Sequence, residues 1–320
     1  MMTSKVTRFR AYQLGSSGSS FSYFADGRFT VLEGRMTEMS SKTLAIEMGH
    51  CEVSCANTLH ITSWDADHCS ASELPALLKL TRPLTLELPG YVPYTDNGKK
   101  SQEILQDYVD DRRTDNRTKS YKYITPDYIA GLDKAQSLCF NDTIYNPLSI
   151  VPDCANDNST VQLFRGGSFN VLSLGDVESS NISARLSRCR ILGRETDVMI
   201  LAHHGADNGF TTKSLLRHIA PSVAICSSDY ANQYDHPRQE IRDLLYEENV
   251  QLKTTKTGDV VVMSTGDHTG ECRVINLITN STAVSSEFDF TAKKKRLLTF
   301  NGDTIRQIYA QTPPWRRIQR

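Results

Sequence analysis

Short apolar runs separated by turn residues fill the first third of the chain. The runs are VTRFRAYQL (6–14), FSYFA (21–25), FTVLEG (29–34), TLAIEM (43–48) and LHITS (59–63). Runs of this length between glycine-rich or polar turns are typical of strands, so we expect a strand in each. A helix is predicted over 70–80, where leucines recur at helical spacing and Ser70 and Glu73 have the spacing of a capping box.

The second half of the chain returns to apolar runs that alternate with helical patterns. The runs are STVQLF (159–164), SFNVLSL (168–174), DVMILA (197–202), SVAICSS (222–228), VQLKTT (250–255) and DVVVMST (259–265). Helices are predicted at 211–219 and 237–249. This order favours an α/β fold with two mixed β-sheets flanked by helices over a doubly wound parallel sheet. We expect one large domain over 1–270, with the polar segment 91–140 as an insertion over one edge, and an extension over 271–320.

Composition is that of an ordinary globular protein: of 320 residues, 39% are hydrophobic and 23% charged, and the formal net charge is −1. The last thirty residues carry eight Lys and Arg against Asp303 alone, a net charge of +7. Such a tail either contacts phosphates or an acidic partner, or is simply solvated. Neither a signal peptide nor an apolar run of about 18 residues is evident, so we expect a cytoplasmic protein without a membrane span. Its eight cysteines form no CxxC pair, which favours reduced thiols over a cysteine zinc site.

Polar clusters follow four of the apolar runs. They are SWDADH (63–68), Asp176, the pair His203 and His204, and His236, which lies ten residues beyond SVAIC. Taken singly, DADH is often a helix cap and Gly-Asp is often a turn. Residues that follow several strands of one sheet can converge at its edge, and histidine with carboxylates is a metal-ligating set. Together the four clusters therefore favour a metal site.

These segments resemble the metallo-β-lactamase-fold hydrolases, and among them the nuclease-type domain at the C-terminus of ComEC/Rec2 competence proteins. The matching segments are AYQLGSSGSSFSYF, TSWDADHCSA, NDNSTVQLFRGGSFNVLSLGD, MILAHHGADNGFTTKSLL and ICSSDYANQYDHPRQEIRDLL. The resemblance covers about residues 5–265, with 91–140 poorly matched. It implies an αββα sandwich of two mixed sheets, with a metal site at one sheet edge.

The resemblance also implies a role for each site residue. The metal ligands would be Asp65, Asp67, His68, Asp176 and His204, with Asp176 bridging two ions. The catalytic residues would be Asp67, His203 and His236, the two histidines facing substrate. Asn158, Ser159 and Tyr234 are candidates for substrate binding, although each has a structural alternative as a turn cap or a packed side chain.

One position departs from the family pattern. Where the signature begins with His, this chain has Ser63, a poor metal ligand. His60 lies an odd number of residues away, so in a strand it points to the opposite face and is not expected to substitute. We therefore expect one tight divalent ion and a second, weak one. The oxygen-rich ligand set favours manganese, with zinc as the alternative.

The predicted function is metal-dependent phosphodiester hydrolysis, with nucleic acid or a phosphorylated small molecule as substrate, and most of all a soluble ComEC-like nuclease. One alternative is a small-molecule or cyclic-nucleotide phosphodiesterase. The other is a degenerate, non-catalytic subunit that senses a ligand or assembles with partner proteins, for example in phage defence, and Ser63 is the argument for it.

Overall fold

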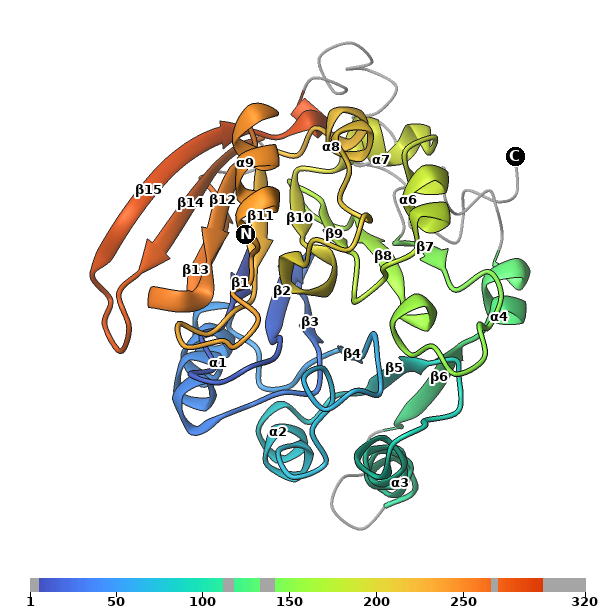
Figure 1. Cartoon of the computed structure of the whole chain (residues 1–320). Coiled ribbons are helices and arrows are strands. Elements are labelled where there is room, and N and C mark those ends of the chain that lie inside the picture. Colours follow the sequence, from blue (N-terminus) through green and yellow to red (C-terminus); the bar gives the residue numbers. More distant parts are fainter. Residues whose placement is uncertain (1–5, 112–117, 133–141, 266–269, 296–320) are drawn as a thin grey trace, which may run out of the picture.

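Two mixed β-sheets pack face to face, and helices cover their outer faces (Figure 1). The computed structural model describes residues 6–111, 118–132, 142–265 and 270–295. This is the αββα sandwich that the sequence predicts, and its two mixed sheets confirm that prediction.

The first sheet has nine strands in the order β15-β14-β13-β1-β2-β3-β4-β5-β6. Their bounds are β1 Arg8–Ala11, β2 Phe21–Ala25, β3 Arg28–Leu32, β4 Thr58–His60, β5 Thr85–Pro89, β6 Ser120–Ile124, β13 Val260–Ser264, β14 Glu271–Leu277 and β15 Val284–Thr291. Pairing is antiparallel from β15 to β3 and parallel from β3 to β6. The carboxyl ends of β3, β4 and β5 therefore lie along the same edge.

The second sheet has six strands in the order β12-β11-β10-β9-β8-β7. Their bounds are β7 Thr143–Asn146, β8 Val161–Phe164, β9 Val171–Ser173, β10 Val198–Ile200, β11 Val223–Cys226 and β12 Gln251–Thr254. Strands β9 to β12 are parallel, whereas β7 and β8 pair antiparallel. The loops after β9, β10 and β11 therefore leave the sheet at one edge.

Helices pack on both outer faces. The helices on the first sheet are α1 (Glu38–His50), α2 (Leu74–Thr81) and α3 (Asp96–Asp110). Helix α4 (Pro126–Gly131) follows β6. The second half of the chain contains α6 (Ser180–Leu186), α7 (Arg190–Glu195), α8 (Lys213–Ile219) and α9 (Gln239–Glu247). Short 3₁₀ turns occur at Asn156–Asn158, Ala202–Gly205 and Thr255–Thr257. Among the described residues, no helix has the length and apolar character needed to cross a bilayer.

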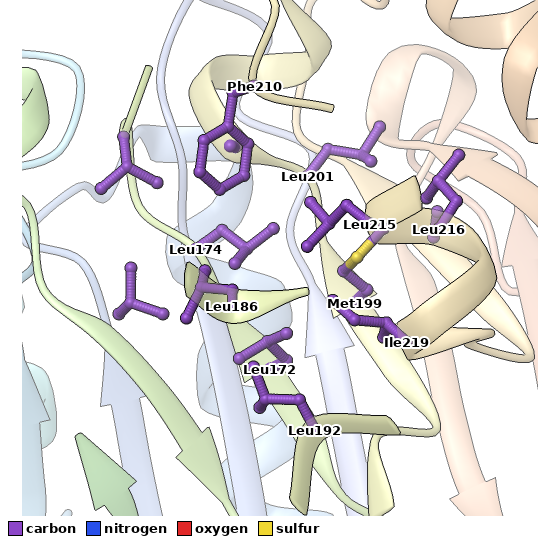
Figure 2. Packing of buried hydrophobic residues seen from close by; sticks show 14 of the residues in the cluster. Leu172, Leu174, Leu186, Leu192, Met199, Leu201, Phe210, Leu215, Leu216 and Ile219 are labelled. Atoms are coloured by element: carbon purple, nitrogen blue, oxygen red, sulfur yellow. The ribbon is translucent and has the colours of Figure 1, made fainter. Parts of the chain in front are cut away.

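Successive side chains of a strand point to opposite faces of the sheet, so they belong to different parts of the hydrophobic core. In β10, Val198 and Ile200 face the first sheet and join a cluster between the sheets, whereas Met199 points to the helices. Figure 2 shows this outer cluster, where Met199 packs with Leu215 and Ile219 of α8. Strands buried on both faces hold the sheet edge rigidly, which is what a site built at that edge requires.

Two local predictions differ from the structure. Residues 43–48 lie in α1 and not in a strand, because Thr37 caps a helix on which Leu44, Glu47 and Met48 share the buried face. The capping box of Ser70 and Glu73 is absent: α2 begins at Leu74 without a side-chain cap. The carboxylate of Glu73 instead binds Arg35 and the backbone N–H of Met36, 2.8 Å away.

Two predicted boundaries fall inside the first sheet. The segment 91–140 contains α3, α4 and also β6, which extends the sheet beyond β5. The predicted boundary at 270 lies between β13 and β14, which pair over five residues. Residues 271–291 therefore continue this sheet, whereas most of the basic tail, 296–320, lies outside the described residues.

Candidate metal centre

Loops that follow the ends of β4, β9 and β10 meet between the two sheets. The first brings Asp67 and His68, the second brings Asp176, and the third brings His204. Each of these four side chains offers one ligand-type atom, and the four atoms lie within 4.8 Å of one another. His68 and Asp176 are almost completely buried, and the other two are half-buried. The sequence predicted these four as ligands of one ion, and the fold brings them together.

The donor set suits a divalent cation. His68 Nε2 lies 2.8 Å from Asp176 Oδ1, and His204 Nε2 lies 3.3 Å from Asp67 Oδ2. Both Nε2 atoms are buried, and neither makes a hydrogen bond of good geometry within the described residues. Donors bound to one ion at about 2.1 Å lie at most about 4.2 Å apart, so the four donors would draw somewhat closer together around an ion.

The pKa values show that this point favours positive charge. Burial alone would lower the pKa of His68, but the carboxylates of Asp176 and Glu33 raise it well above its usual 6.5. Burial would likewise raise the pKa of Asp67, yet the close contact with His204 and the charge of His68 hold it below its usual range. Protons on the imidazoles thus supply the charge that a bound cation would replace.

A buried carboxylate orients His68. Glu33, at the end of β3, is 2% exposed, and its Oε1 lies 3.2 Å from His68 Nδ1. Thr62 fixes this carboxylate by donating from its hydroxyl to Oε1 at 2.6 Å and from its N–H to Oε2 at 3.0 Å. A proton held on Nδ1 leaves the lone pair of Nε2 directed to the centre, which is the tautomer that a metal ligand needs.

A backbone carbonyl orients His204 in the same way. Its Nδ1 lies 2.9 Å from the carbonyl oxygen of Ser227, which follows β11, and Nε2 faces Asp67. The turn at 203–205 is left-handed throughout, with φ of 43°, 52° and 80°. Gly205 ends it because a Cβ there would stand 2.7 Å from the Pro237 side chain. The HHG motif therefore aims one ring at the centre in a turn that only glycine can complete.

The glycine-rich turn between β1 and β2 closes the site from the side of the first sheet. Ser19 N–H donates to the carbonyl of Asp67 at 2.9 Å, and the Ser227 hydroxyl donates to the carbonyl of Gly18 at 2.8 Å. A Cβ on Gly18 would lie 2.6 Å from the Asp67 carbonyl oxygen. The turn thus links the loop after β4 to the loop after β11, and only a residue without a side chain permits this approach.

Two further imidazoles lie beside the centre. The His203 ring is 6.3 Å from the His204 ring and 6.0 Å from that of His236. His236 stacks on His204 at 6.3 Å, and the exposed Tyr234 stacks on His236 at 5.6 Å. His203 Nδ1 contacts the carboxylate of Glu178. Burial and the two neighbouring histidines lower the pKa of His236 to about 4. Neither ring belongs to the four-donor group, and their role towards substrate stays a prediction.

Asp65 and Ser63 lie at the rim of the centre. Asp65 is not part of the four-donor group. Burial and the charge of Asp67 raise the pKa of its carboxyl group. Ser63 is fully buried, and its hydroxyl lies 2.9 Å from the hydroxyl of Tyr91. The position where the family signature has histidine is therefore filled by a packed Ser-Tyr pair. His60 is buried elsewhere, paired with Glu87 Oε2 at 3.0 Å, in agreement with its predicted opposite face.

The three candidate substrate-binding residues differ in their exposure to solvent. Asn158 is fully buried, and its side chain makes two 2.8 Å hydrogen bonds with the backbone of Val151, which is the structural alternative for this residue. Ser159 is also fully buried, and its Cβ lies 2.8 Å from where a Cβ on Gly175 would stand. Of the three candidates, only Tyr234 is solvent-exposed, at 59%.

Sequence reasoning missed the residues that position the ligands. Glu33 follows a predicted strand in the run FTVLEG, just as the ligand clusters do, and this placement was the available signal. Ser19 and Glu178 carried no signal beyond their neighbours. Tyr91 was hidden in the segment assigned to an insertion.

Two curated proteins are similar to this chain in sequence. ComE operon protein 3 of Bacillus subtilis is 25% identical over 209 residues, which are 64% of this chain and 24% of that protein. Recombination protein 2 of Haemophilus influenzae is 31% identical over 112 residues, 35% of this chain and 14% of that protein. The resemblance to ComEC/Rec2 proteins is thereby confirmed, over about a quarter of their length or less. No family model matches the chain.

The comparison with solved structures found proteins with a similar arrangement. Igni18, a metallo hydrolase from Ignicoccus hospitalis, matches with a TM-score of 0.46 and 10% identity, over 80% of this chain and 98% of its own. The metallo-β-lactamase fold protein YhfI from Bacillus subtilis matches with a TM-score of 0.46 and 13% identity, over 79% and 98%. At such identities these likenesses say nothing about a shared activity.

Proposed function

We propose that this protein is a metal-dependent phosphodiester hydrolase, with a polynucleotide as substrate. The observation that carries the proposal is the grouping of six side chains at one sheet edge: four metal-type donors within 4.8 Å of one another, with His203 and His236 beside them. The similarity to ComE operon protein 3 and Recombination protein 2 supports nucleic acid over a β-lactam as the substrate class.

The ligands Asp67, His68, Asp176 and His204 would hold one ion tightly. A divalent ion there would neutralise charge on a phosphodiester and lower the pKa of a bound water towards ~7. Two carboxylates and two imidazoles accept either manganese or zinc. Asp65 and Asp176 alone would remain for a second ion, because Ser63 is engaged with Tyr91, so that ion would bind weakly.

His203 and His236 would bind the substrate phosphate. His236 is neutral near pH 7 because its pKa lies at about 4, so in the free protein it accepts or donates one hydrogen bond without charge. A phosphate anion next to this ring would raise its pKa and allow it to pass a proton to the leaving oxygen. Tyr234, which is exposed and stacks on His236, would contact the neighbouring part of the substrate.

A second candidate is a non-catalytic protein that binds a phosphorylated ligand or partner proteins, and the buried Ser63-Tyr91 pair is the observation that favours it. A cyclic-nucleotide phosphodiesterase would use the same ligands on a smaller substrate. The proposed hydrolase and these two candidates differ in which substrate is cleaved, or in whether any is cleaved at all. One set of cleavage assays therefore distinguishes them.

The test combines metal analysis with cleavage. Purified protein is incubated with single-stranded DNA, double-stranded DNA, RNA and cyclic dinucleotides in manganese, magnesium or zinc, beside the Asp67→Ala variant. We expect about one tightly bound ion per chain, and cleavage that is lost together with the ion in the variant. If no substrate is cleaved with any metal while the ion is retained, the proposed activity is wrong and the binding function replaces it.

A further inference from the structure

A basic pocket lies next to the candidate metal centre, between α9, β12 and the edge of the first sheet. Its volume is about 310 Å³. It is lined by Pro237, Arg242, Leu252, Lys253, Thr254, Lys256 and Asn276. Three of these seven residues are cationic and none is acidic, so the pocket has the character of an anion site.

Two contacts join the pocket to the centre. Pro237, which lines the pocket, follows His236 directly and packs on Gly205 in the HHG turn. On the other side, Thr255 exchanges hydrogen bonds of 3.1 Å with the backbone of Ser228, next to the residue that orients His204. These contacts connect the pocket to the loops that carry His204, His236 and Ser227.

The three cations are only partly neutralised. Arg242 lies 3.4 Å from Asp235, a loose and exposed pair. The Lys253 ammonium donates to the Ser286 hydroxyl at 2.7 Å and lies over the Phe288 ring, with no carboxylate against it in the described ranges. Across the same described residues, the Lys256 ammonium is not part of any ion pair, and its backbone carbonyl accepts from Gln13. Partial burial lowers the pKa of Lys253, which indicates a charge that an anion would stabilise.

We infer that this pocket binds a phosphate group of the substrate strand other than the scissile one. The inference rests on the proposed function in one respect, that the ligand is a polynucleotide strand. The affinity of the pocket for a phosphate group does not require that the strand is cleaved. Arginine and lysine on a concave surface are the groups that proteins use against backbone phosphates, and the hydroxyl of Thr254 adds a neutral hydrogen-bonding group. Because Pro237 lines the pocket and directly follows His236, a strand bound at the metal centre would place a neighbouring phosphate in this pocket.

The experiment measures binding first. Full-length protein is kept free of metal with a chelator, so that nothing is cleaved, and is titrated into a fluorescent single-stranded 20-mer at several salt concentrations. Lys256→Gln and Lys253→Gln are compared with wild type, and Lys79→Gln, exposed on α2 over the other sheet, is the matched control. Thermal unfolding of each variant establishes that it is folded.

Each pocket variant should weaken binding by about threefold to tenfold, and the double variant should lower the salt dependence of log Kd by about 0.7, the contribution of one phosphate contact on a single strand. The control should match wild type. Titration with inorganic phosphate distinguishes the sources of the anion: competition at concentrations far below those needed for general salt screening indicates a free-phosphate site instead of a strand contact. Unchanged affinity and salt slope in folded pocket variants overturn the inference.

The outcome is separable from that of the proposed function. If wild type cleaves nothing but binds the 20-mer through Lys253 and Lys256, the pocket stands and the hydrolase proposal fails. If wild type cleaves and the variants bind and cleave as it does, the reverse holds. Where both hold, the variants should lose far more activity on the 20-mer than on bis(p-nitrophenyl) phosphate, which carries a single phosphate and cannot reach both sites.

Discussion

Replacing Glu33 with glutamine keeps the size of a fully packed side chain and removes only its charge. In the native protein the carboxylate accepts two hydrogen bonds from Thr62 and faces Nδ1 of His68 at 3.2 Å. A glutamine can still accept from the Thr62 N–H through its oxygen, but its NH₂ group must then face the Thr62 hydroxyl and the imidazole. Because an N–H donor opposite Nδ1 favours the tautomer with its proton on Nε2, the variant places a proton on the atom that faces Asp176.

The expected consequence is weaker metal binding with little change in fold. Loss of a residue that orients a metal-ligating histidine typically costs ~10- to 100-fold in affinity, which is about 1.4 to 2.7 kcal/mol. The chain offers a matched control in Glu87→Gln, because Glu87 pairs with the buried His60 at 3.0 Å and has no part in the four-donor group. Both variants lose the charge of a His-carboxylate pair, and only one of those pairs touches the centre.

The assay is a competition titration of manganese or zinc between the protein and a chromogenic chelator, with thermal unfolding measured in the metal-free state. We expect Glu33→Gln to bind the ion ~10- to 100-fold more weakly than Glu87→Gln and wild type. Equal metal affinities for Glu33→Gln, Glu87→Gln and wild type would show that His68 is not a ligand through Nε2, and the assignment of the centre would have to be abandoned.

Three more predictions address catalysis, the second ion and stability. His203→Ala and His236→Ala should each lower turnover by ~10²- to 10⁴-fold while metal content measured by atomic emission stays at one ion per chain; loss of the ion from His236→Ala would make that ring a ligand instead. Ser63→His should destabilise the protein by about 1 to 3 kcal/mol in urea unfolding, because Ser63 is fully buried against Tyr91. Only the double variant with Tyr91→Ser should bind a second ion more tightly in a metal titration. Two equally tight ions in wild type would contradict this. Glu47→Gln should cost about 3 kcal/mol at pH 7, because this buried carboxylate binds Arg8 at 2.6 Å and Arg10 at 3.2 Å. Burial would raise the pKa of Glu47, but the two arginines hold it below 4.5, so its contribution is complete above pH 4.5 and disappears as the pH falls through the folded pKa; a difference between variant and wild type that persists in urea unfolding at the lowest pH would refute that account.

Short apolar runs between turn residues predicted the strands well because this pattern is a local property. The run FSYFA coincides with β2, and the runs that became β8 to β13 differ from the observed strands only at their ends. Residues 43–48 failed because TLAIEM also alternates, and what decides for a helix is the buried carboxylate of Glu47, satisfied by arginines about forty residues away in β1. Long-range pairing of this kind leaves no trace in a hydrophobic pattern.

In the candidate centre, too, some residues could be predicted from the sequence and others could not. The four donors could be predicted because each lies in a loop after a strand, and neighbouring parallel strands direct such loops to one edge of the sheet. Glu33 also follows a predicted strand, but it has no histidine or second carboxylate beside it, so its placement alone did not single it out. The engagement of Ser63 with Tyr91 depends on a residue 28 positions away, in a segment whose polar composition indicated surface.

The four donors are divided evenly between the halves of the sandwich: Asp67 and His68 come from the loop after a strand of the first sheet, and Asp176 and His204 from loops of the second. An ion bound by all four is therefore a cross-link between the sheets as well as a chemical group. Since such an ion binds only when both halves are in register, it stabilises the folded chain by RT ln(1 + [M]/Kd), about 2.7 kcal/mol at a hundredfold excess over Kd. The thermal stability of this protein should then vary with free metal concentration. A substitution deep in the interface between the sheets, far from any donor, would reveal itself first as a weakened affinity for the ion.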